Sequence, residues 1–534
     1  MIPHIPFSPA LRGWELRAFS GLDRREGAPE GSLRAMRNLG GEAAPFLSSR
    51  PARRRLAELA RPNGLFALGE RLFTVSGTTL LLDGEPVGAV ADGPKQFCAL
   101  GERVLIWPDK LLWSPAGGLE PLEALYASTA LSFTDGVYAG QEAAANCIHT
   151  AGPPFPFRPG DAVTVSGASD AANNKTVVIR EKSADGCSLY CSENCFVPAD
   201  ETGRALTLSR TAPELDFVFS HENRLWGCRG DTVCCSKLGD PFNWNVFDGL
   251  STDAWSVETG TPGAFTAACS FLGYPCFFKE RRVFKVYGSR PANFELLGAA
   301  TLGVRAGCEK SLAVAGETLY YLSPAGFAAY SGGLPRLADQ ALGPEKHVEA
   351  VAGSDGLCYV VSARLPSGAW ELLRYDPARG VWLREDETRL LALCYRGGLL
   401  GLTAAGQLLL LGRGEGPPPA GSVPEGRFLS EAELPPFEAG SFGGKYPLRL
   451  WLRLGLGNAE PEEAEEPVSV TVFVAFDGGE WEEAAGLTAG LLCETDLPVP
   501  LRRCSRFALR LRADGPWTLR GLRWEVYAER SRRR

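Results

Sequence analysis

The stretch LFALGERLFTVSGTTLLLDG, from Leu65 to Gly84, indicates the fold of most of this 534-residue chain. It reads as an apolar strand, a Gly-containing turn, a second apolar strand, another turn and a third strand. Related copies begin at Gln96, Phe217, Phe265 and Ser311, and two more begin near Ala350 and Leu391. Repeats with a period of about 40 residues and several short strands each predict an all-β protein built as a β-propeller of about seven blades.

Composition supports this prediction. The chain has 62 Gly and 39 Pro, which suits many tight turns between short strands.

The net charge of the chain is −8, which argues against a surface that binds nucleic acid throughout. The 15 cysteines show no disulfide framework, so we expect free thiols in a reducing compartment. We find neither a secretory signal nor an apolar run of the ~18 residues that a membrane span needs, and we expect folding in a cytosol.

The spacing of the repeats predicts the domain organisation. Residues 1–62 read as an N-terminal arm, with one possible short helix in PARRRLAELA (51–60). We expect a strand of this arm, around Met36 to Ser48, to close the propeller ring against the last repeat. The first blades occupy 63–135 and the remaining blades 211–435.

Two segments depart from the repeat. Residues 136–210 contain far more chain than one blade needs, in short alternating strands, and predict a small β-barrel inserted into a loop. Residues 436–534 have longer strands and predict a β-sandwich. The stretch CSRFALRLRADG shows the alternation expected for a sheet with one buried and one solvent-exposed face: Phe507, Leu509 and Leu511 alternate with arginines.

No catalytic or metal motif is apparent in the sequence, and we predict no catalytic residue, metal ligand or cofactor. The four histidines, His4, His149, His221 and His347, belong to no nucleophile or zinc pattern. Zinc is the minor alternative for the cysteines of the insert, and free thiols are the main one. These residues are Cys147, Cys187, Cys191 and Cys195, with His149 nearby in sequence.

Two basic clusters and one aromatic pair are the candidate contact residues. Arg50, Arg53, Arg54 and Arg55 form the first cluster, which we interpret as a protein–protein contact. Arg530 and 532–534 form the second, interpreted as a solvated tail. The turn Gly239-Asp240-Pro241 should deliver Phe242 and Trp244 to a packing surface, because proline holds the preceding residue extended.

The segment NRLWGCRGDTVCCSKLGDPFNWNVFDG, from Asn223 to Gly249, resembles a stretch of the tail nozzle proteins of short-tailed phages, also called tail accessory or DNA-stabilisation proteins. The opening GLDRR … MRNL … LSSRP (21–51), FFKERRVFKVYGS (277–289) and PLRRCSRFALRLRADG (500–515) are also similar to this family, as found in prophages.

The resemblance implies a structural virion protein of the tail, present in the host cytoplasm before assembly. A hexameric ring of propellers would lie below the portal and its head-to-tail adaptor, extend the DNA channel, retain packaged DNA and contact tail fibres or tail tip proteins. The family carries no catalytic residues that map onto this chain.

Two rival hypotheses belong to other classes. A carbohydrate-active propeller enzyme with a sugar-binding sandwich would need convergent carboxylates with perturbed pKa values. Two short candidate motifs do not recur at matching blade positions: Ser354-Asp355-Gly356 and DGGEW (477–481). A propeller hub for peptides outside phage is the third hypothesis.

Overall fold

The computed structural model describes residues 11–137, 144–191, 194–417, 419–437, 445–456, 467–489 and 493–528. These residues form strands and turns; the only helical elements among them are short 3₁₀ turns, η1 (Ala171–Asn173), η2 (Pro291–Asn293), η3 (Glu309–Ser311) and η4 (Gln340–Leu342). The chain is therefore all-β, as predicted. Within the described residues, no helix has the length and apolar character needed to cross a bilayer. Contacts divide the chain into two compact units, Asn63–Glu309 and Met1–Pro62 with Lys310–Arg534.

The unit Asn63–Glu309 contains four antiparallel four-stranded sheets, each with its strands in sequence order. The first is β6 (Pro62–Leu68), β7 (Arg71–Ser76), β8 (Thr79–Leu82) and β9 (Glu85–Ala89), and the second is β10 (Gln96–Leu100), β11 (Arg103–Trp107), β12 (Leu111–Ser114) and β13 (Gly118–Pro121). The third is β22 (Phe217–His221), β23 (Arg224–Arg229), β24 (Thr232–Cys235) and β25 (Trp255–Glu258), and the fourth is β26 (Ala267–Phe271), β27 (Tyr274–Lys279), β28 (Arg282–Tyr287) and β29 (Glu295–Ala300).

Strand β11 shows why these sheets stack. Its side chains alternate: Val104 and Ile106 join a cluster with β7 and β8, whereas Leu105 and Trp107 join a cluster with the β22–β25 sheet. A strand buried on both faces needs a sheet on each side. The first strands β10 and β22, and β22 and β26, also lie side by side. Small sheets stacked face to face with their first strands adjacent form a propeller-like arrangement.

The adjacent cysteines on β24 follow the same rule. Cys234 joins the cluster shared with β11, and Cys235 joins the cluster shared with the β26–β29 sheet. The two side chains therefore face opposite sides of the strand. The prediction of three strands per repeat is wrong, because each sheet has a fourth strand. These fourth strands are half-exposed, as in β9 and β13, and so lack a clear apolar pattern.

The segment predicted as an insert forms one eight-stranded sheet in the same unit. Its strands are β14 (Ala124–Ser128), β15 (Leu131–Gly136), β16 (Ala144–Thr150), β17 (Ala162–Ser166), β18 (Thr176–Lys182), β19 (Ser188–Cys191), β20 (Ala199–Asp200) and β21 (Leu206–Arg210). The sheet begins at Ala124 rather than at residue 136, because β14 pairs along its length with β21. Sixteen buried residues fill its own core, which includes Phe133, Phe157 and Ile179.

The second unit holds three further small sheets. The first is β30 (Ala313–Ala315), β31 (Thr318–Ser323), β32 (Gly326–Tyr330) and β33 (Arg336–Leu337), and the second is β34 (Glu349–Ser354), β35 (Tyr359–Arg364), β36 (Trp370–Asp376) and β37 (Val381–Arg384). The third is β38 (Leu390–Tyr395), β39 (Leu399–Thr403), β40 (Gln407–Leu410), β5 (Arg54–Glu58) and β41 (Val423–Pro424). The first strands β30, β34 and β38 again lie beside one another.

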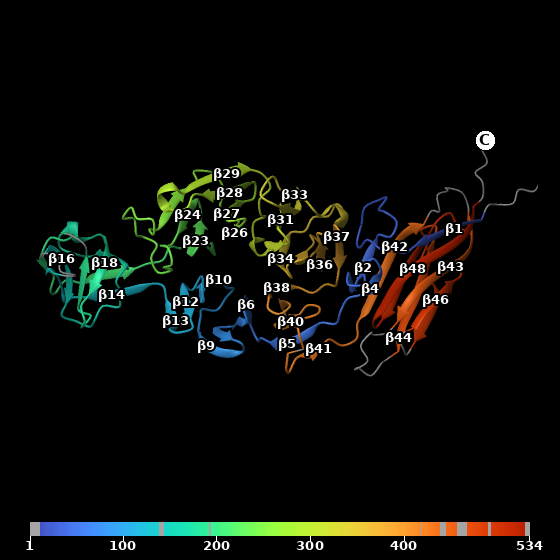
Figure 1. The fold of residues 1–534 in the computed structure, drawn as a ribbon, viewed down its shortest axis with the longest axis horizontal. Helices are drawn as coiled ribbons and strands as arrows, with labels where there is room; N and C mark the ends of the chain where they lie inside the picture. Colours follow the sequence, from blue (N-terminus) through green and yellow to red (C-terminus); the bar gives the residue numbers. More distant parts are fainter. Residues whose placement is uncertain are drawn as a thin grey trace, which may run out of the picture. The chain divides into compact units, whose positions relative to one another are not determined.

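Two larger sheets complete this unit (Figure 1). The six-stranded sheet contains β1 (Leu11–Leu16), β3 (Leu39–Gly40), β4 (Leu47–Ser49), β43 (Lys445–Leu456), β46 (Cys493–Val499) and β48 (Trp517–Ala528). The five-stranded sheet contains β2 (Ala35–Arg37), β42 (Leu429–Phe437), β44 (Val468–Phe476), β45 (Glu482–Ala489) and β47 (Phe507–Asp514). Their buried faces meet: the rings of Phe437 and Trp524 lie 4.7 Å apart, and the Trp517 indole donates to Ser430 at 2.5 Å.

The N-terminal arm contributes strands to three sheets. Figure 1 shows β1 beside β48 and β43, and β2 pairs with β42. The predicted closing strand around Met36 to Ser48 is therefore wrong, because these residues pair with the large sheets. The arm strand that joins the last repeat is β5, which pairs with β40. The predicted short helix at 51–60 is also wrong, since this strand pairing outweighs local helix propensity.

Candidate functional site at the arm–sheet seam

Two buried arginines, Arg50 and Arg53, lie just before β5, where the N-terminal arm meets the last small sheet. We call this region the arm–sheet seam. The Arg50 side chain forms a two-pronged ion pair with Glu425, with nitrogen–oxygen distances of 2.7 and 2.8 Å. Arg53 donates to Glu385 at 2.8 Å and to Asp386 at 2.7 Å. Arg50 and Arg53 are only 5% and 4% exposed. These pairs therefore bind the arm to loops more than 300 residues away in sequence.

The electrostatics of this cluster are those of fully paired charges. Burial alone would lower the pKa of Arg53, but the charges of Glu385 and Asp386 outweigh it and raise that pKa. Burial would raise the pKa of both carboxyl groups, and the neighbouring arginines lower it instead. Each group thus remains charged at neutral pH, because its partner offsets the cost of desolvation.

A second cluster ties an earlier part of the arm to the β34–β37 sheet. Arg24 lies 2.5 Å from Glu371, and Arg384 donates to the same carboxylate at 3.0 Å. His347 lies 3.3 Å from it. Burial would raise the pKa of Glu371, but hydrogen bonds from His347 and Arg24 and the nearby positive charges lower it to about 2. The arm is therefore held at two separate charged points.

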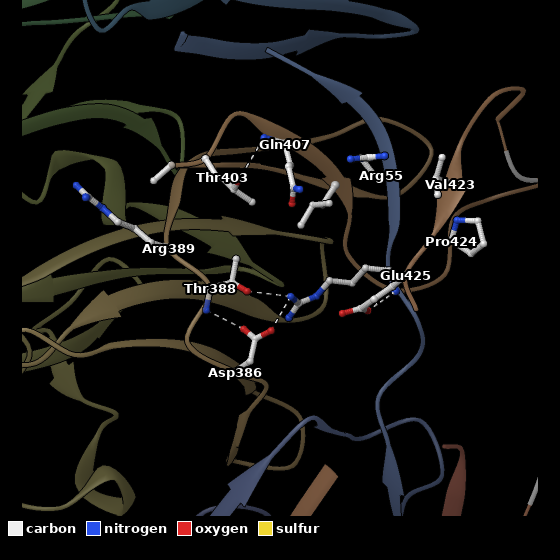
Figure 2. Close-up of a pocket in the computed structure, with 13 residues that line it drawn as sticks. Arg55, Asp386, Thr388, Arg389, Thr403, Gln407, Val423, Pro424 and Glu425 are labelled. Carbon is white, nitrogen blue, oxygen red and sulfur yellow. Dashed lines mark hydrogen bonds and ion pairs between the residues drawn. The ribbon is translucent and has the colours of Figure 1, made fainter. Parts of the chain in front are cut away.

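A pocket of about 540 Å³ opens beside the first cluster (Figure 2). Its described lining consists of Arg53, Arg55, Asp386, Thr388, Arg389, Thr403, Ala404, Ala405, Gln407, Leu409, Val423, Pro424 and Glu425. The Arg53 Nε–H group has no hydrogen-bond partner among the described residues. Arg389 stacks on Trp370, with its guanidinium 4.9 Å from the ring centroid. This lining offers hydrogen-bond donors, and the described part of it contains no cysteine, serine or histidine nucleophile.

The structure places two of the four predicted contact arginines inside the molecule. Arg50 and Arg53 are buried against carboxylates of their own chain, so neither guanidinium forms an exposed surface. Arg54 is half-buried on β5, and Arg55 keeps an exposed side chain that pairs with Glu58. Arg530 and 532–534 lie outside the described residues. The carboxylates Glu385, Asp386 and Glu425 were not predicted, because nothing local in sequence indicates a partner so distant along the chain.

Phe242 and Trp244 also lie inside the molecule, in the unit Asn63–Glu309. Both belong to the core cluster shared by β11 and the β22–β25 sheet, as the turn before them predicts. Both side chains are buried, with exposures of 8% and 3%, and their role in a contact between molecules stays a prediction. Asn243 between them accepts a hydrogen bond from the Ala162 amide at 2.8 Å, so this segment anchors the eight-stranded sheet.

The cysteines and histidines of the inserted sheet form no metal centre. Cys147 and Cys191 are buried, and His149 contacts Ser188 at 3.1 Å. Across the described residues, no group of three or more His, Cys, Asp or Glu side chains is arranged to hold a metal ion. The fourteen cysteines whose side chains the structure describes are free thiols. His4 lies outside the described residues.

Comparison with known proteins gives no family. No family model and no curated protein matches the chain. Solved structures with partial likeness include Raptor from Chaetomium thermophilum, which is 10% identical over 69% of this chain and 30% of its own, with a TM-score of 0.31. The endosialidase of phage phi92 is 8% identical over 72% and 56% (TM-score 0.17), and a puromycin hydrolase is 13% identical over 71% and 59% (TM-score 0.25). The chain spans less than two thirds of each, and such low scores carry no argument about function.

Proposed function

We propose that this protein is a structural subunit of a phage or prophage tail, the nozzle subunit of a hexameric ring below the portal and its adaptor. The ring would extend the DNA channel, retain packaged DNA and present contacts for tail fibres or tip proteins. In this proposal the small sheets are about seven blades of one propeller. The eight-stranded sheet is an inserted barrel, and the two large sheets are a sandwich.

One observation carries the proposal: strands from the two ends of the chain interlock within one unit. Strands from residues 11–58 complete sheets made of residues 390–528, and buried ion pairs hold the arm at Glu371 and at Glu385. A subunit that must transmit load in a ring benefits from such interlocking, because local opening then breaks several sheets together. The resemblance of Asn223–Gly249 and the other segments to nozzle proteins supports the same function.

The charge of the chain suits a conduit. A net charge of −8 repels phosphates on average, so DNA can slide past a wall that does not hold it. We expect weak, salt-sensitive binding of duplex DNA by the purified protein. Tight binding at physiological salt in a filter or anisotropy assay would contradict this part of the proposal.

The rival reading as a glycoside hydrolase is not favoured by any observation in the structure. Its general acid would need a carboxyl group with a raised pKa. Among the described carboxyl groups with a resolved shift, the pKa is lowered in every case.

Cryo-electron microscopy of the purified full chain, alone and with its adaptor, tests the proposal. We expect rings with six-fold symmetry and a central channel, visible in class averages. A monomer that stays monomeric at the concentrations of assembly, or that cleaves oligosaccharides, would overturn it. Portal and adaptor genes beside this one would add independent support.

A further inference from the structure

The pocket at the arm–sheet seam, which we call the seam pocket, has no role in the proposed ring. Its volume of about 540 Å³ is typical of sites for small ligands. Two distant parts of the chain build it: Arg53 and Arg55 come from the arm, and the rest of the described lining comes from residues 386–425. The pocket is therefore complete only while the arm strand β5 is paired with the last small sheet.

Strand register explains one wall of the seam pocket. Leu409, Arg55 and Val423 stand opposite one another on β40, β5 and β41, so their side chains share one face of this sheet. Gln407 lies two positions before Leu409 on β40 and joins the same face. Figure 2 shows Gln407, Arg55 and Val423 along this wall. The lining also has an apolar part, which consists of Ala404, Ala405, Leu409, Val423 and Pro424.

The acids of the seam pocket are satisfied within the chain. Asp386 accepts from the Arg53 guanidinium at 2.7 Å and from the Thr388 amide at 2.9 Å, with one bond at each oxygen. Glu425 accepts from Arg50 at both oxygens, and from the Arg53 amide at 3.0 Å. Neither carboxylate therefore needs a donor or a cation from a ligand.

The arginines of the seam pocket keep donors to spare. The Arg389 side chain forms no hydrogen bond or ion pair with any residue that the structure describes, and it stacks on Trp370. Stacking uses the flat face of the guanidinium, so the N–H groups along its edge can still donate. The Arg53 Nε–H group lacks an acceptor among the same residues, although the side chain is 96% buried. Arg55 is held by an exposed pair with Glu58, which contributes little.

We propose that the seam pocket binds a carboxylate carried on a short aliphatic chain, as a glutamate side chain or a peptide C-terminus provides. The edge of the Arg389 guanidinium matches a carboxylate with two parallel hydrogen bonds. Arg55 adds positive charge, and the aliphatic part of the ligand contacts Leu409 and Val423. Inorganic phosphate fits less well, because it has no apolar part to cover that wall. This binding does not depend on the proposed ring.

Isothermal titration calorimetry of the full chain with four short peptides and inorganic phosphate tests the inference. One peptide has a glutamate between two capped alanines, and its match has glutamine there. Another ends in a free carboxylate after two alanines, and its match ends in an amide. We expect a carboxylate peptide to bind about tenfold more tightly than its neutral match, because a bond to charged arginine is lost in the match. The tighter of the two carboxylates identifies the source. Equal binding of charged and neutral peptides, no binding of either carboxylate, or tighter binding of phosphate than of both carboxylates overturns the inference.

Variants of the stacked arginine locate the binding. Arg389→Gln should weaken the carboxylate peptide about tenfold and leave its neutral match unchanged. Arg389→Lys keeps the charge but not the planar edge, so its loss should be smaller. Trp370→Leu removes the surface that positions Arg389 and should also weaken only the carboxylate peptide. The control is Arg502→Gln, which removes an exposed arginine outside the described lining that pairs with Glu482 at 2.7 Å. If Arg389→Gln and Arg502→Gln bind the carboxylate peptide equally well, the pocket is not the site.

Binding should also hold the arm in place. Because Arg53 and Arg55 leave the pocket when β5 opens, the ligand binds only the closed seam. At a peptide concentration of about ten times its Kd, opening becomes about tenfold rarer, and hydrogen exchange of the β5 amides should slow by about that factor. A peptide that binds without slowing this exchange binds elsewhere and refutes the inference. These results are the same for a monomer and for a ring, so failure here leaves the nozzle proposal standing.

Discussion

Replacement of Arg53 by methionine should release the arm from the last small sheet. The change removes the charge that Glu385 and Asp386 face, whose side chains are 8% and 15% exposed. Loss of one partner of a buried ion pair costs about 3–5 kcal/mol, because the remaining charge is left without compensation. Glu385 keeps Arg374 at 3.4 Å, so we expect the lower end of this range, about 3 kcal/mol.

Hydrogen exchange of the β5 amides measures this loss directly. Strand β5 pairs with β40, and the Leu59 amide donates to the Gly406 carbonyl at 2.8 Å. A loss of about 3 kcal/mol makes opening of this pairing more than about 100-fold more frequent, and exchange should accelerate by that factor.

Two variants control the measurement. Arg55→Met, in the same strand but in an exposed pair with Glu58, should change exchange by less than about 1 kcal/mol. Adding Glu385→Gln and Asp386→Asn to Arg53→Met should recover part of the loss, since it removes the stranded charges. If the β5 amides exchange at the same rate in Arg53→Met as in Arg55→Met, the buried ion pairs do not hold the arm and the reasoning is wrong.

Three further predictions follow from the same unit and from the core. The pKa of Glu371 is lowered from 4.5 to about 2 in the folded chain, so its stabilisation is present above the unfolded value and is lost as the pH falls from there towards 2. The midpoint temperature of thermal unfolding should fall over this pH range in wild type, and it should fall less in Glu371→Gln. Gly406→Ala should cost about 1–3 kcal/mol in chemical denaturation, because its Cβ would overlap the Leu59 carbonyl oxygen at a φ of +90°. Gly412 has a similar φ and open space around it, so Gly412→Ala measures the cost of the backbone conformation without a steric overlap. Burial raises the pKa of the Cys98 thiol to about 12, so this thiol should stay unmodified by a disulfide reagent until the protein unfolds, as read by mass spectrometry.

The fold could be predicted from sequence wherever a strand carries its own pattern. Phe507, Leu509 and Leu511 are buried and alternate with arginines, as the period of two requires. Strand β11 lacks such alternation because both of its faces are buried, yet its repeat context identifies it. Fourth strands such as β9 have no clear apolar pattern, and sequence reasoning missed them.

The candidate site was predicted only in part. The cluster Arg50 to Arg55 drew attention because its charges are adjacent in sequence. Its interpretation as a protein–protein contact stays a prediction, and the burial of Arg50 and Arg53 was not foreseen, because burial depends on what packs above them. The carboxylates of Glu385 and Glu425 that neutralise them lie in loops whose local sequence resembles any polar turn.

The amino-acid sequence by itself determined the all-β class, the order of the small sheets along the chain and, where a strand alternates, the side of it that is buried. These properties depend on residues a few positions apart, through the alternation of the strand and the chemistry of turns. Only the tertiary structure decided that β5 completes the last small sheet and that β1 and β2 enter the large ones. Backbone pairing is nearly independent of side-chain identity, so the partner of an edge strand is chosen by chain geometry and by buried charges that meet only after folding.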